Sequence, residues 1–291
     1  MTTKNSLPRF LSPLRYPGGK SCISKFMSAL LADNDLEGVD YAEPYAGGAG
    51  LALFLLMSGL VSNIHINDLD KSIYAFWHVL LSSPDELCSW VSTVDVNLEN
   101  WQYFHDMQNC PQKVSESDLA KSTFFLNRTN VSGVISGGPI GGRKQEGKYT
   151  LDVRFNRADL IKRIERISKY ADHISLSNED GIEFINGLNH NEDCFVYLDP
   201  PYYRKAPGLY MNFFEREDHE RLASFVRELN APWMVSYDYD EFILSLYTTP
   251  CRVKYQLSQC ASNRVGDEIL IFKDSLKYQH AVSLLHQAET V

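Results

Sequence analysis

Residues 39–70, which decide the fold, read VDYAEPYAGGAGLALFLLMSGLVSNIHINDLD. They open on a short run that fits a buried strand, and the glycines of 44–50 then predict a turn that leads into a helix over 51–58. The alternating run 64–66 predicts a second strand, which ends just before Asp68. Strand, glycine turn, helix, strand and acid follow one another in this order in nucleotide-binding βαβ units, so we expect an α/β fold.

The same α/β pattern occupies the second half of the chain, from about residue 156 onward. Helical periodicity predicts helices over 158–170, 181–188, 219–229 and 241–246. Short apolar runs predict strands over 174–176, 194–198, 233–236 and 268–272.

Residues 72–155 interrupt this pattern. Helices are predicted over the aromatic stretch 73–81 and over 119–126, with acidic polar runs between them, and the glycine-rich stretch 131–148 comes after the second helix. Many glycines disfavour a packed helix and favour hairpins or mobile loops. We therefore predict that 72–155 is inserted into a single α/β domain formed by 1–71 and 156–291.

The composition excludes several classes of protein. Of the 291 residues, 44% are hydrophobic and 22% are charged, which excludes a disordered chain. The longest apolar stretch, 51–57, is too short to span a bilayer, so we expect no membrane contact. Prolines and glycines between residues 8 and 19 argue against a secretory signal. The six cysteines form no Cys-x-x-Cys pair and indicate reduced thiols in a cytoplasmic protein.

Charge is distributed unevenly along the chain. The formal net charge of −9 argues at first against a nucleic-acid partner. However, residues 1–30 hold five basic and no acidic side chains, and residues 141–170 hold nine basic against four acidic ones. Two basic segments in an acidic chain are compatible with a cationic groove for DNA. The alternative is a solvated helix face near Lys162 and Lys169.

Two features of the first βαβ unit indicate a nucleoside cofactor. Glycines in the turn over Glu43–Gly50 let the backbone approach a ligand at the amide end of a helix. Asp68, roughly 20 residues further on, can accept hydrogen bonds from both ribose hydroxyls. The alternative is structural, because glycine turns after strands are common and Asn67, Asp68 or Asp70 could each cap a helix.

The most specific motif, Asp199-Pro200-Pro201-Tyr202, follows an apolar strand. Its prolines fix φ and remove two N–H donors, so the Pro200 carbonyl lies in a rigid turn. The Asp199 carboxylate and this carbonyl can accept the two N–H groups of an exocyclic amine, which favours a pyramidal nitrogen aimed at an electrophile. Tyr202 offers a flat face to an aromatic substrate. The structural alternative is that the prolines only end the strand.

The chain resembles the Dam-like group of adenine-specific DNA methyltransferases over residues 14 to about 273. The resemblance rests on five motifs, which are Leu14-Arg15-Tyr16-Pro17-Gly18-Gly19-Lys20, the glycine turn after Glu43-Pro44, Asp68, Asn127-Arg128 and Asp199–Tyr202. It implies a Rossmann-like, S-adenosylmethionine-dependent methyltransferase fold with an inserted, mainly helical target-recognition domain over 72–155. The implied reaction transfers the methyl group of S-adenosylmethionine to the exocyclic amino group of a flipped adenine in double-stranded DNA.

The resemblance also implies roles for individual residues. It makes Asp199, Pro200 and Tyr202 catalytic, with Tyr202 stacking on the extruded base. Cofactor contacts are expected from Tyr16, Lys20, Glu43, Tyr45, Gly47, Asp68 and Asp199. DNA contacts are expected from Asn127, Arg128, and from Asn263 and Arg264 in a late loop over 258–268 that closes over the base. Independently of the resemblance, phosphates could order the glycine-rich stretch through Arg143, Lys144 and Lys148.

The chain departs from the family's pattern at two places. Ala49 stands where the glycine turn has its third glycine, and we expect a negative φ there, which tolerates a Cβ. Residues 134–138 lack the arginine that GATC-reading members place there to contact guanine, so GATC is not predicted as the recognition site.

Several alternatives stay open. The chain could methylate an amine in RNA or a glutamine side-chain amide in a protein, or it could be a catalytically silent DNA-binding relative. No metal is expected, because none of the eight histidines has a ligand partner at suitable spacing. We expect a monomer or weak dimer that associates with DNA and has a bacterial, phage or mobile-element origin.

Overall fold

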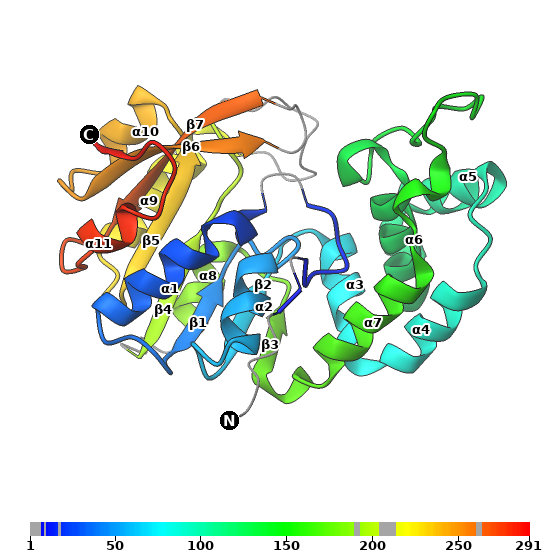
Figure 1. Cartoon of the computed structure of the whole chain (residues 1–291), viewed down its shortest axis with the longest axis horizontal. Helices are drawn as coiled ribbons and strands as arrows, with labels where there is room; N and C mark the ends of the chain where they lie inside the picture. Colours follow the sequence, from blue (N-terminus) through cyan, green and yellow to red (C-terminus); the bar gives the residue numbers. More distant parts are fainter. Residues whose placement is uncertain (1–6, 9, 17–18, 189–192, 204–213, 260–263) are drawn as a thin grey trace.

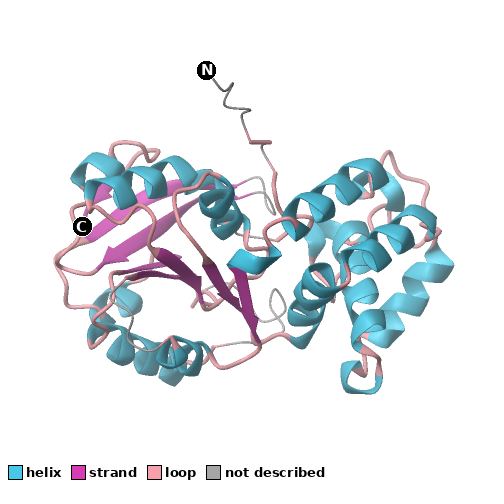
Figure 2. Ribbon diagram, turned by 90° about the horizontal axis from the view of Figure 1, so that it is seen from below, coloured by secondary structure: helices cyan, strands magenta, loops and turns pink. Residues whose placement is uncertain are grey.

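The structure is a computed structural model that describes residues 7–8, 10–16, 19–188, 193–203, 214–259 and 264–291. A sheet with helices on both faces forms one half of the molecule, and a lobe of helices lies beside it (Figure 1, Figure 2). The expected α/β fold is therefore confirmed.

The central sheet contains eight described strands in the order β3-β2-β1-β4-β5-β7-β6-β8. Their bounds are β1 Asp40–Glu43, β2 Ile64–Asn67, β3 Ile174–Ser177, β4 Cys194–Leu198, β5 Trp233–Asp238, β6 Arg252–Gln259, β7 Arg264–Phe272 and β8 Glu289–Thr290. The pairs from β3 to β5 are parallel, whereas β7 pairs antiparallel with β5 and β6. The carboxyl ends of β1, β2 and β4 therefore meet at one edge, where open α/β sheets bind ligands.

The helices form two groups (Figure 1). Those around the sheet are α1 Ser24–Asp33, α2 Gly50–Met57, α8 Gly181–Gly187, α9 Arg216–Arg227, α10 Glu241–Leu246 and α11 Gln279–Val282. Those of the helical lobe are α3 Lys71–Ser82, α4 Pro84–Thr93, α5 Leu98–Met107, α6 Glu116–Thr129 and α7 Arg157–Ser168.

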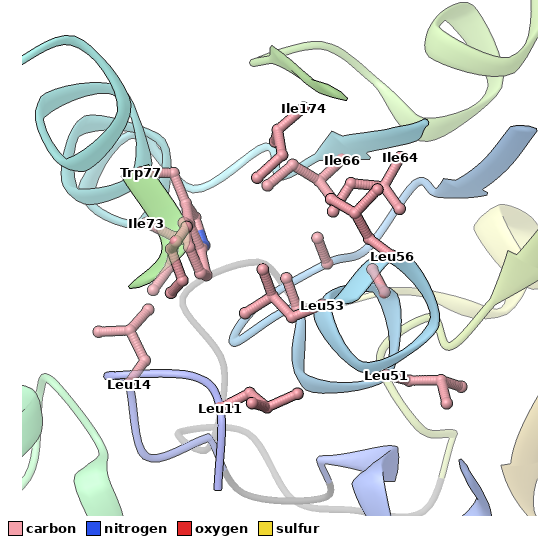
Figure 3. Close-up of a cluster of buried hydrophobic side chains, with 14 of the residues drawn as sticks. Leu11, Leu14, Leu51, Leu53, Leu56, Ile64, Ile66, Ile73, Trp77 and Ile174 are labelled. Carbon is pink, nitrogen blue, oxygen red and sulfur yellow. The ribbon is translucent and has the colours of Figure 1, made fainter. Parts of the chain in front are cut away.

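Alternate residues of the central strands enter two separate apolar cores. Tyr41 and Phe195 belong to the core that includes α1 and α2, whereas Ala42 and Val196 belong to the core that includes α9. This alternation follows from the opposite directions of successive side chains in a strand. Figure 3 shows part of the first core, where leucines of α2 pack near the isoleucines of β2. The two cores hold the sheet rigid on both faces behind the edge where the motifs lie.

The helical lobe is built around α6, on which α3 and α5 pack. Its interior is aromatic, with ring contacts that join Phe104 to Phe125, and both Phe124 and Phe125 to Phe155. Although α7 lies after the segment 72–155 in the sequence, it packs on α4. The division into a catalytic domain and an inserted domain stays a prediction.

Two helices of the lobe are not predicted by the sequence analysis, which sees only acidic polar runs there. The buried side chains Leu87 and Val91 of α4 are spaced i, i+4, and Trp101 and Phe104 of α5 are spaced i, i+3. This is the spacing of one helical face, but each helix has only one such pair. Polar residues dominate both sequences because the opposite faces lie at the surface.

The bounds 258–268 expected for the late loop are wrong, while its contact with the base and with DNA stays a prediction. The described part of this range belongs to a hairpin of β6 and β7, in which Ser258 pairs with Val265. Residues 260–263 lie outside the described part of the chain. The sequence of β6, RVKYQLSQ, alternates polar and apolar residues, which is the signal that would have predicted it.

Candidate active site

Three predicted motifs meet at the carboxyl edge of the sheet. The glycine turn follows β1, Asp68 follows β2, and Asp199 follows β4. Because β1 lies between β2 and β4, the order of the strands brings these distant parts of the sequence together.

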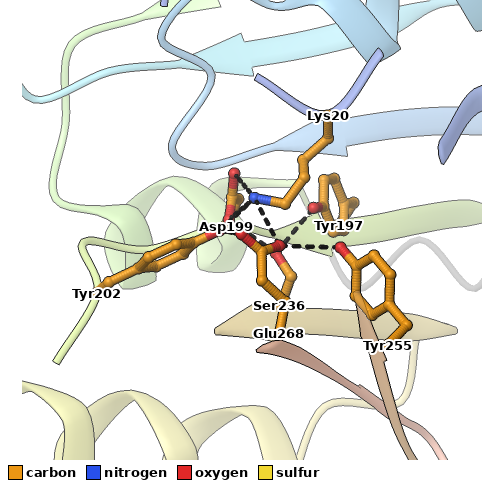
Figure 4. Close-up of polar contacts among 7 residues, drawn as sticks. All are labelled: Lys20, Tyr197, Asp199, Tyr202, Ser236, Tyr255 and Glu268. Atoms are coloured by element: carbon orange, nitrogen blue, oxygen red, sulfur yellow. Dashed lines mark hydrogen bonds and ion pairs between the residues drawn. The ribbon is translucent and has the colours of Figure 1, made fainter. Parts of the chain in front are cut away.

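Asp199 lies at the centre of a largely buried ionic cluster (Figure 4). Nζ of Lys20, the first residue of a short 3-10 helix, donates to Oδ1 and to Oδ2 of Asp199, at 2.8 Å in both cases. Oγ of Ser236 on β5 donates to Oδ1 at 2.7 Å. The Asp199 side chain is 23% exposed, so part of the carboxylate stays accessible at the edge of the sheet.

The structure therefore joins the N-terminal motif to the Asp-Pro-Pro-Tyr motif through Lys20. The resemblance implies a cofactor contact for this lysine, whereas its ammonium here holds the carboxylate of Asp199. Its contact with a cofactor stays a prediction.

Tyr202 lies beside this cluster and is only 4% exposed. Its hydroxyl donates to Oε1 of Glu268 at 3.1 Å and accepts from Nζ of Lys20, which lies 5.0 Å from the centroid of the ring. Burial raises the pKa of Tyr202 well above its ordinary value, so the hydroxyl keeps its proton. Because Pro200 and this ring are both buried, a base can stack on Tyr202 only after neighbouring atoms move.

Tyr16, Gly47 and Asp68 form a second group at the same edge. The N–H of Gly47 donates to Oδ2 of Asp68 at 2.9 Å, and the φ of Gly47 is 47°. A Cβ on Gly47 would meet the Tyr16 ring at 2.6 Å. Both observations require glycine at this position, because it combines a left-handed backbone with a close aromatic neighbour.

Ala49 is also left-handed, with a φ of 46° and a ψ of 30°. The expectation of a negative φ at this residue is therefore wrong. The cost for a residue with a Cβ is roughly 1–2 kcal/mol. The turn imposes this conformation because the N–H of Ala49 donates to the carbonyl of Ala46 at 2.6 Å, while its own carbonyl accepts from Leu53 in the first turn of α2.

Asp68 is not the helix cap that the sequence left as an alternative. The N-cap of α3 is Asp70, whose side chain accepts from the N–H of Ser72. Asn67 instead donates to the carbonyl of Pro44 at 2.9 Å. Asp68 accepts the N–H of Asp70 on Oδ1 at 3.0 Å, and burial raises its pKa to about 7.

Glu43 lies behind the glycine turn and is 6% exposed. Its Oε1 accepts the hydroxyl of Tyr41 at 2.9 Å and the N–H of Ala52 at 3.1 Å. Burial raises the pKa of Glu43 to about 8. Tyr45 packs against α8, where a Cβ on Gly181 would meet its hydroxyl at 2.6 Å. The cofactor contacts expected of Glu43 and Tyr45 stay predictions.

Glu43→Gln is expected to reduce the loss of stability at high pH. Because the folded protein favours the protonated acid, its stability falls as the pH rises from about 4.5 through about 8. One such group can change the free energy of unfolding by up to about 1.4 kcal/mol per pH unit. Asp68 contributes in the same direction, but only up to about pH 7. The clearest comparison is therefore the change in Tm between pH 7 and 8, with exposed Glu37→Gln as the control. An equal change in Tm in wild type and in Glu43→Gln would contradict the predicted contribution of Glu43.

A sequence model of the D12 class N6 adenine-specific DNA methyltransferase family matches residues 16–259. The chain belongs to this family. Two type II methyltransferases are similar to this D12-class protein. M.CviBI from Paramecium bursaria Chlorella virus NC1A is 25% identical over 233 residues, which cover 79% of this chain and 85% of that protein. M.MjaIII from Methanocaldococcus jannaschii is 25% identical over 256 residues, which cover 80% of this chain and 86% of that protein.

A more distant likeness is seen among solved structures. The putative methyltransferase yhhF from Escherichia coli aligns with 90% of this chain and 92% of that chain, at 10% identity and a TM-score of 0.34. A likeness this weak carries no argument about the D12-class protein.

In this D12-class protein, Asn127 and Arg128 hold the N-terminal segment against the lobe. Asn127 is 1% exposed; its Oδ1 accepts the N–H of Arg15 at 2.7 Å, and its Nδ2 donates to the carbonyls of Arg15 and Gly133 at 2.8 and 2.9 Å. The guanidinium of Arg128 donates to the carbonyl of Arg154, and burial lowers its pKa to about 9. Both side chains are buried and engaged within the protein, and the DNA contacts expected of them stay predictions.

The other expected DNA contacts lie in two places. Arg143, Lys144 and Lys148 are exposed on the helical lobe. The guanidinium of Arg143 lies 5.4 Å from the centroid of the Trp101 ring. Asn263 lies outside the described residues, and the side chain of Arg264 is likewise not described.

The glycine-rich stretch 131–148 forms hydrogen-bonded turns. The N–H of Val131 donates to the carbonyl of Gly138 at 3.0 Å, and the N–H of Ile140 to the carbonyl of Thr129 at 2.8 Å. No α-helix is described within 131–148, as the glycines predicted, whereas the expected mobility of the stretch stays a prediction. Its ordering on DNA stays a prediction.

The sequence analysis missed three polar side chains of the site, Ser236, Tyr255 and Glu268. Ser236 is a polar residue within the apolar run of β5, and Glu268 directly precedes the apolar end of β7, whereas Tyr255 is one of the apolar positions of the alternating strand β6. A buried polar group needs a partner, but the sequence does not identify that partner.

No described helix has the length and apolar character that crossing a membrane requires. No group of three or more histidine, cysteine, aspartate or glutamate side chains in the described ranges could hold a metal ion.

Proposed function

We propose that this protein transfers a methyl group from S-adenosylmethionine to N6 of an adenine within a specific sequence of double-stranded DNA, with the target base rotated out of the helix. Membership of the D12 class supports adenine as the target base and DNA as the substrate. The observation that carries the proposal is the Asp199 carboxylate, which is held by Lys20 and Ser236 at the edge of the sheet.

The arrangement around Asp199 suits an amine that is a poor nucleophile. Lys20 and Ser236 fix the carboxylate without enclosing it, because the side chain is 23% exposed. An N6 hydrogen donated to Asp199 and a second donated to the Pro200 carbonyl would hold the nitrogen pyramidal, with its lone pair aimed at the methyl group. In the proposed transfer, the N6–methyl bond would form as the sulfur–methyl bond breaks, the sulfur would keep that electron pair as a neutral thioether, and one N6 proton would pass to water at the partly exposed Asp199 carboxylate. Asp199 and Pro200 thus act by orientation and electrostatics.

The residues at the end of β1 and β2 fit S-adenosylmethionine. Gly47 lets the Tyr16 ring lie directly against the turn, at a place where a Cβ would meet the ring at 2.6 Å. The half-buried carboxylate of Asp68 suits the two ribose hydroxyls of a nucleoside, since they can donate to it. When bound, the cofactor supplies an electrophilic methyl group. Tyr16, Gly47 and Asp68 would hold it beside Asp199.

Base flipping agrees with the burial of the catalytic motif. Inside a duplex, N6 of adenine cannot reach a carboxylate at the edge of a sheet, so the base must leave the stack. We propose that Tyr202 then stacks on it. Tyr202 is 4% exposed, so the base can bind only after atoms around the ring move. The DNA-bound state is therefore expected to be more open at Tyr202 than the structure described here.

We propose that the glycine-rich stretch 131–148 of the helical lobe contacts DNA through Arg143, Lys144 and Lys148, and replacing these three residues with alanine tests this role. DNA binding is expected to weaken, and the slope of log K against log salt to become shallower by about 0.9 for each phosphate that the variant no longer neutralises. Cofactor affinity is expected to stay unchanged, because Tyr16, Gly47 and Asp68 belong to the other half of the molecule.

The matched control removes three basic residues from α7 and its C-cap, as Lys162→Ala, Arg166→Ala and Lys169→Ala. It changes the net charge equally, and these residues form the helix face that the sequence left as a solvated alternative. Fluorescence anisotropy over a range of salt concentrations measures both variants. If the variant of Arg143, Lys144 and Lys148 keeps the salt slope of wild type, the DNA contacts lie elsewhere on the protein.

The proposed function is tested by expression in a host without DNA methylation, followed by long-read sequencing. We expect N6-methyladenine at one recurring sequence. Unmethylated DNA together with methylated RNA or protein would support the alternative substrates. A protein that binds DNA but not S-adenosylmethionine would be a silent relative.

A further inference from the structure

We propose that Glu268 is a positioning residue of the active site, whose carboxylate orients Asp199 through Lys20 and Tyr202. This inference rests on the proposed function. Glu268 lies on β7, in the antiparallel part of the sheet, whereas the predicted motifs follow parallel strands. It is 0% exposed, so it meets the site from inside the protein.

Three polar groups converge on the Glu268 carboxylate (Figure 4). The hydroxyl of Tyr202 donates to Oε1 at 3.1 Å, and the hydroxyl of Tyr255 donates to Oε2 at 2.9 Å. Nζ of Lys20 lies 3.7 Å from Oε2. Tyr255 is directly opposite Glu268 in the pairing of β6 and β7, so the hairpin fixes this carboxylate.

The charges of the cluster explain why a second acid is useful. Lys20 has a 2% exposed side chain and lies between two carboxylates, those of Asp199 and Glu268. A buried ammonium with one carboxylate partner would form a tight pair with it and compete with any other donor. By sharing Lys20, Glu268 leaves Asp199 with more capacity to accept the N6 hydrogens of the target adenine.

Glu268 also sets the hydroxyl of Tyr202. That hydroxyl has a single proton, which it donates to Glu268, so its oxygen accepts from Lys20. This hydrogen-bond direction fixes the ring that is proposed to stack on the base. Ring, ammonium and catalytic carboxylate are thus connected through one buried acid.

Glu268→Gln tests the proposal, because glutamine keeps the shape and removes the charge. We expect kcat on the mapped DNA site to fall roughly ten- to hundredfold. The Kd for S-adenosylmethionine, measured by calorimetry, and the Tm are expected to change little. On a duplex with 2-aminopurine at the target position, we expect a smaller rise in fluorescence, since the flipped base is held less firmly.

Tyr255→Phe is the matched control. It removes one hydroxyl from the same carboxylate but leaves Lys20 and Tyr202 in contact with it, so its loss of kcat is expected to be the smaller one. If Glu268 only stabilised the fold, Glu268→Gln would lower Tm and cofactor affinity together with kcat. That result, or a kcat within twofold of wild type, would overturn the proposal. An inactive wild type would instead contradict the proposed function.

A double-mutant cycle shows whether Glu268 acts through Tyr202. Tyr202→Phe keeps the ring and removes the hydroxyl that bonds to Glu268. In this background Glu268→Gln is expected to cost less kcat than it does in wild type, because one of the hydrogen bonds that it breaks is already absent. If the fold reductions in kcat of the two single variants multiply to give that of the double variant, the two residues act independently. That result would overturn the proposed action of Glu268 through Tyr202.

Discussion

Asp199→Ala is expected to lower kcat for adenine methylation by about a hundredfold or more, while the protein stays folded. The target amine would lose the charged acceptor that orients it. The fold should persist because the Asp199 side chain is partly exposed and Lys20 keeps Glu268, at 3.7 Å, as a second partner. Single-turnover rates measure the effect, and thermal melting checks the fold.

Two further variants separate the roles of the carboxylate. Asp199→Asn keeps the shape and one acceptor oxygen but removes the charge, so its rate is expected to lie between those of wild type and Asp199→Ala. Ser236→Ala removes only the hydroxyl that donates to Oδ1 at 2.7 Å and should cost less than either. Near-normal turnover of Asp199→Ala would refute the catalytic role. A folded variant that binds neither cofactor nor DNA would make Asp199 structural.

Asp68→Ala is expected to weaken S-adenosylmethionine binding by roughly 1.5–3 kcal/mol, while DNA binding changes little. The alanine removes the acceptor proposed for the ribose hydroxyls and also the acceptor for the N–H of Gly47. Calorimetry measures the affinity. Asp70→Ala is the control, because it removes the cap of α3 and leaves the proposed ribose acceptor in place.

The pH dependence of this binding gives a second readout for Asp68. Burial raises its pKa to about 7, and the ionised form is the better acceptor for two hydroxyls. Cofactor affinity is therefore expected to rise as the pH rises through 7, and Asp68→Asn should abolish that rise. Unchanged affinity in Asp68→Ala would leave Asp68 with only the backbone contacts of the turn.

The sequence was most informative where one strand and its following turn carry the signal. The order of strand, glycine turn, strand and acid at residues 39–70 correctly predicted the parallel pairing of β1 and β2. It also placed Asp68 and the turn together, because both follow neighbouring strands. The same local reasoning failed at Ala49, since its left-handed φ depends on hydrogen bonds to Ala46 and Leu53.

The least predictable part of the site was the contact between distant segments. Nothing in the local sequence indicates that Lys20 reaches Asp199, or that Glu268 approaches from an antiparallel strand. These contacts depend on the position of β7 next to β5, which is a property of the whole sheet. Family resemblance marked Lys20 and Asp199 separately but did not pair them.

The attachment of Arg15 to Asn127 has a consequence for chimeras that would test the proposed role of the helical lobe. The backbone N–H and C=O of Arg15 are both bonded by a side chain of α6, and the next residue is Tyr16, whose ring lies against the glycine turn. A chimera that exchanged only a contiguous block of the lobe between relatives would pair one protein's α6 with another's N-terminus. The unit that can be transplanted is therefore discontinuous, and it includes the residues around Arg15 as well as the helices.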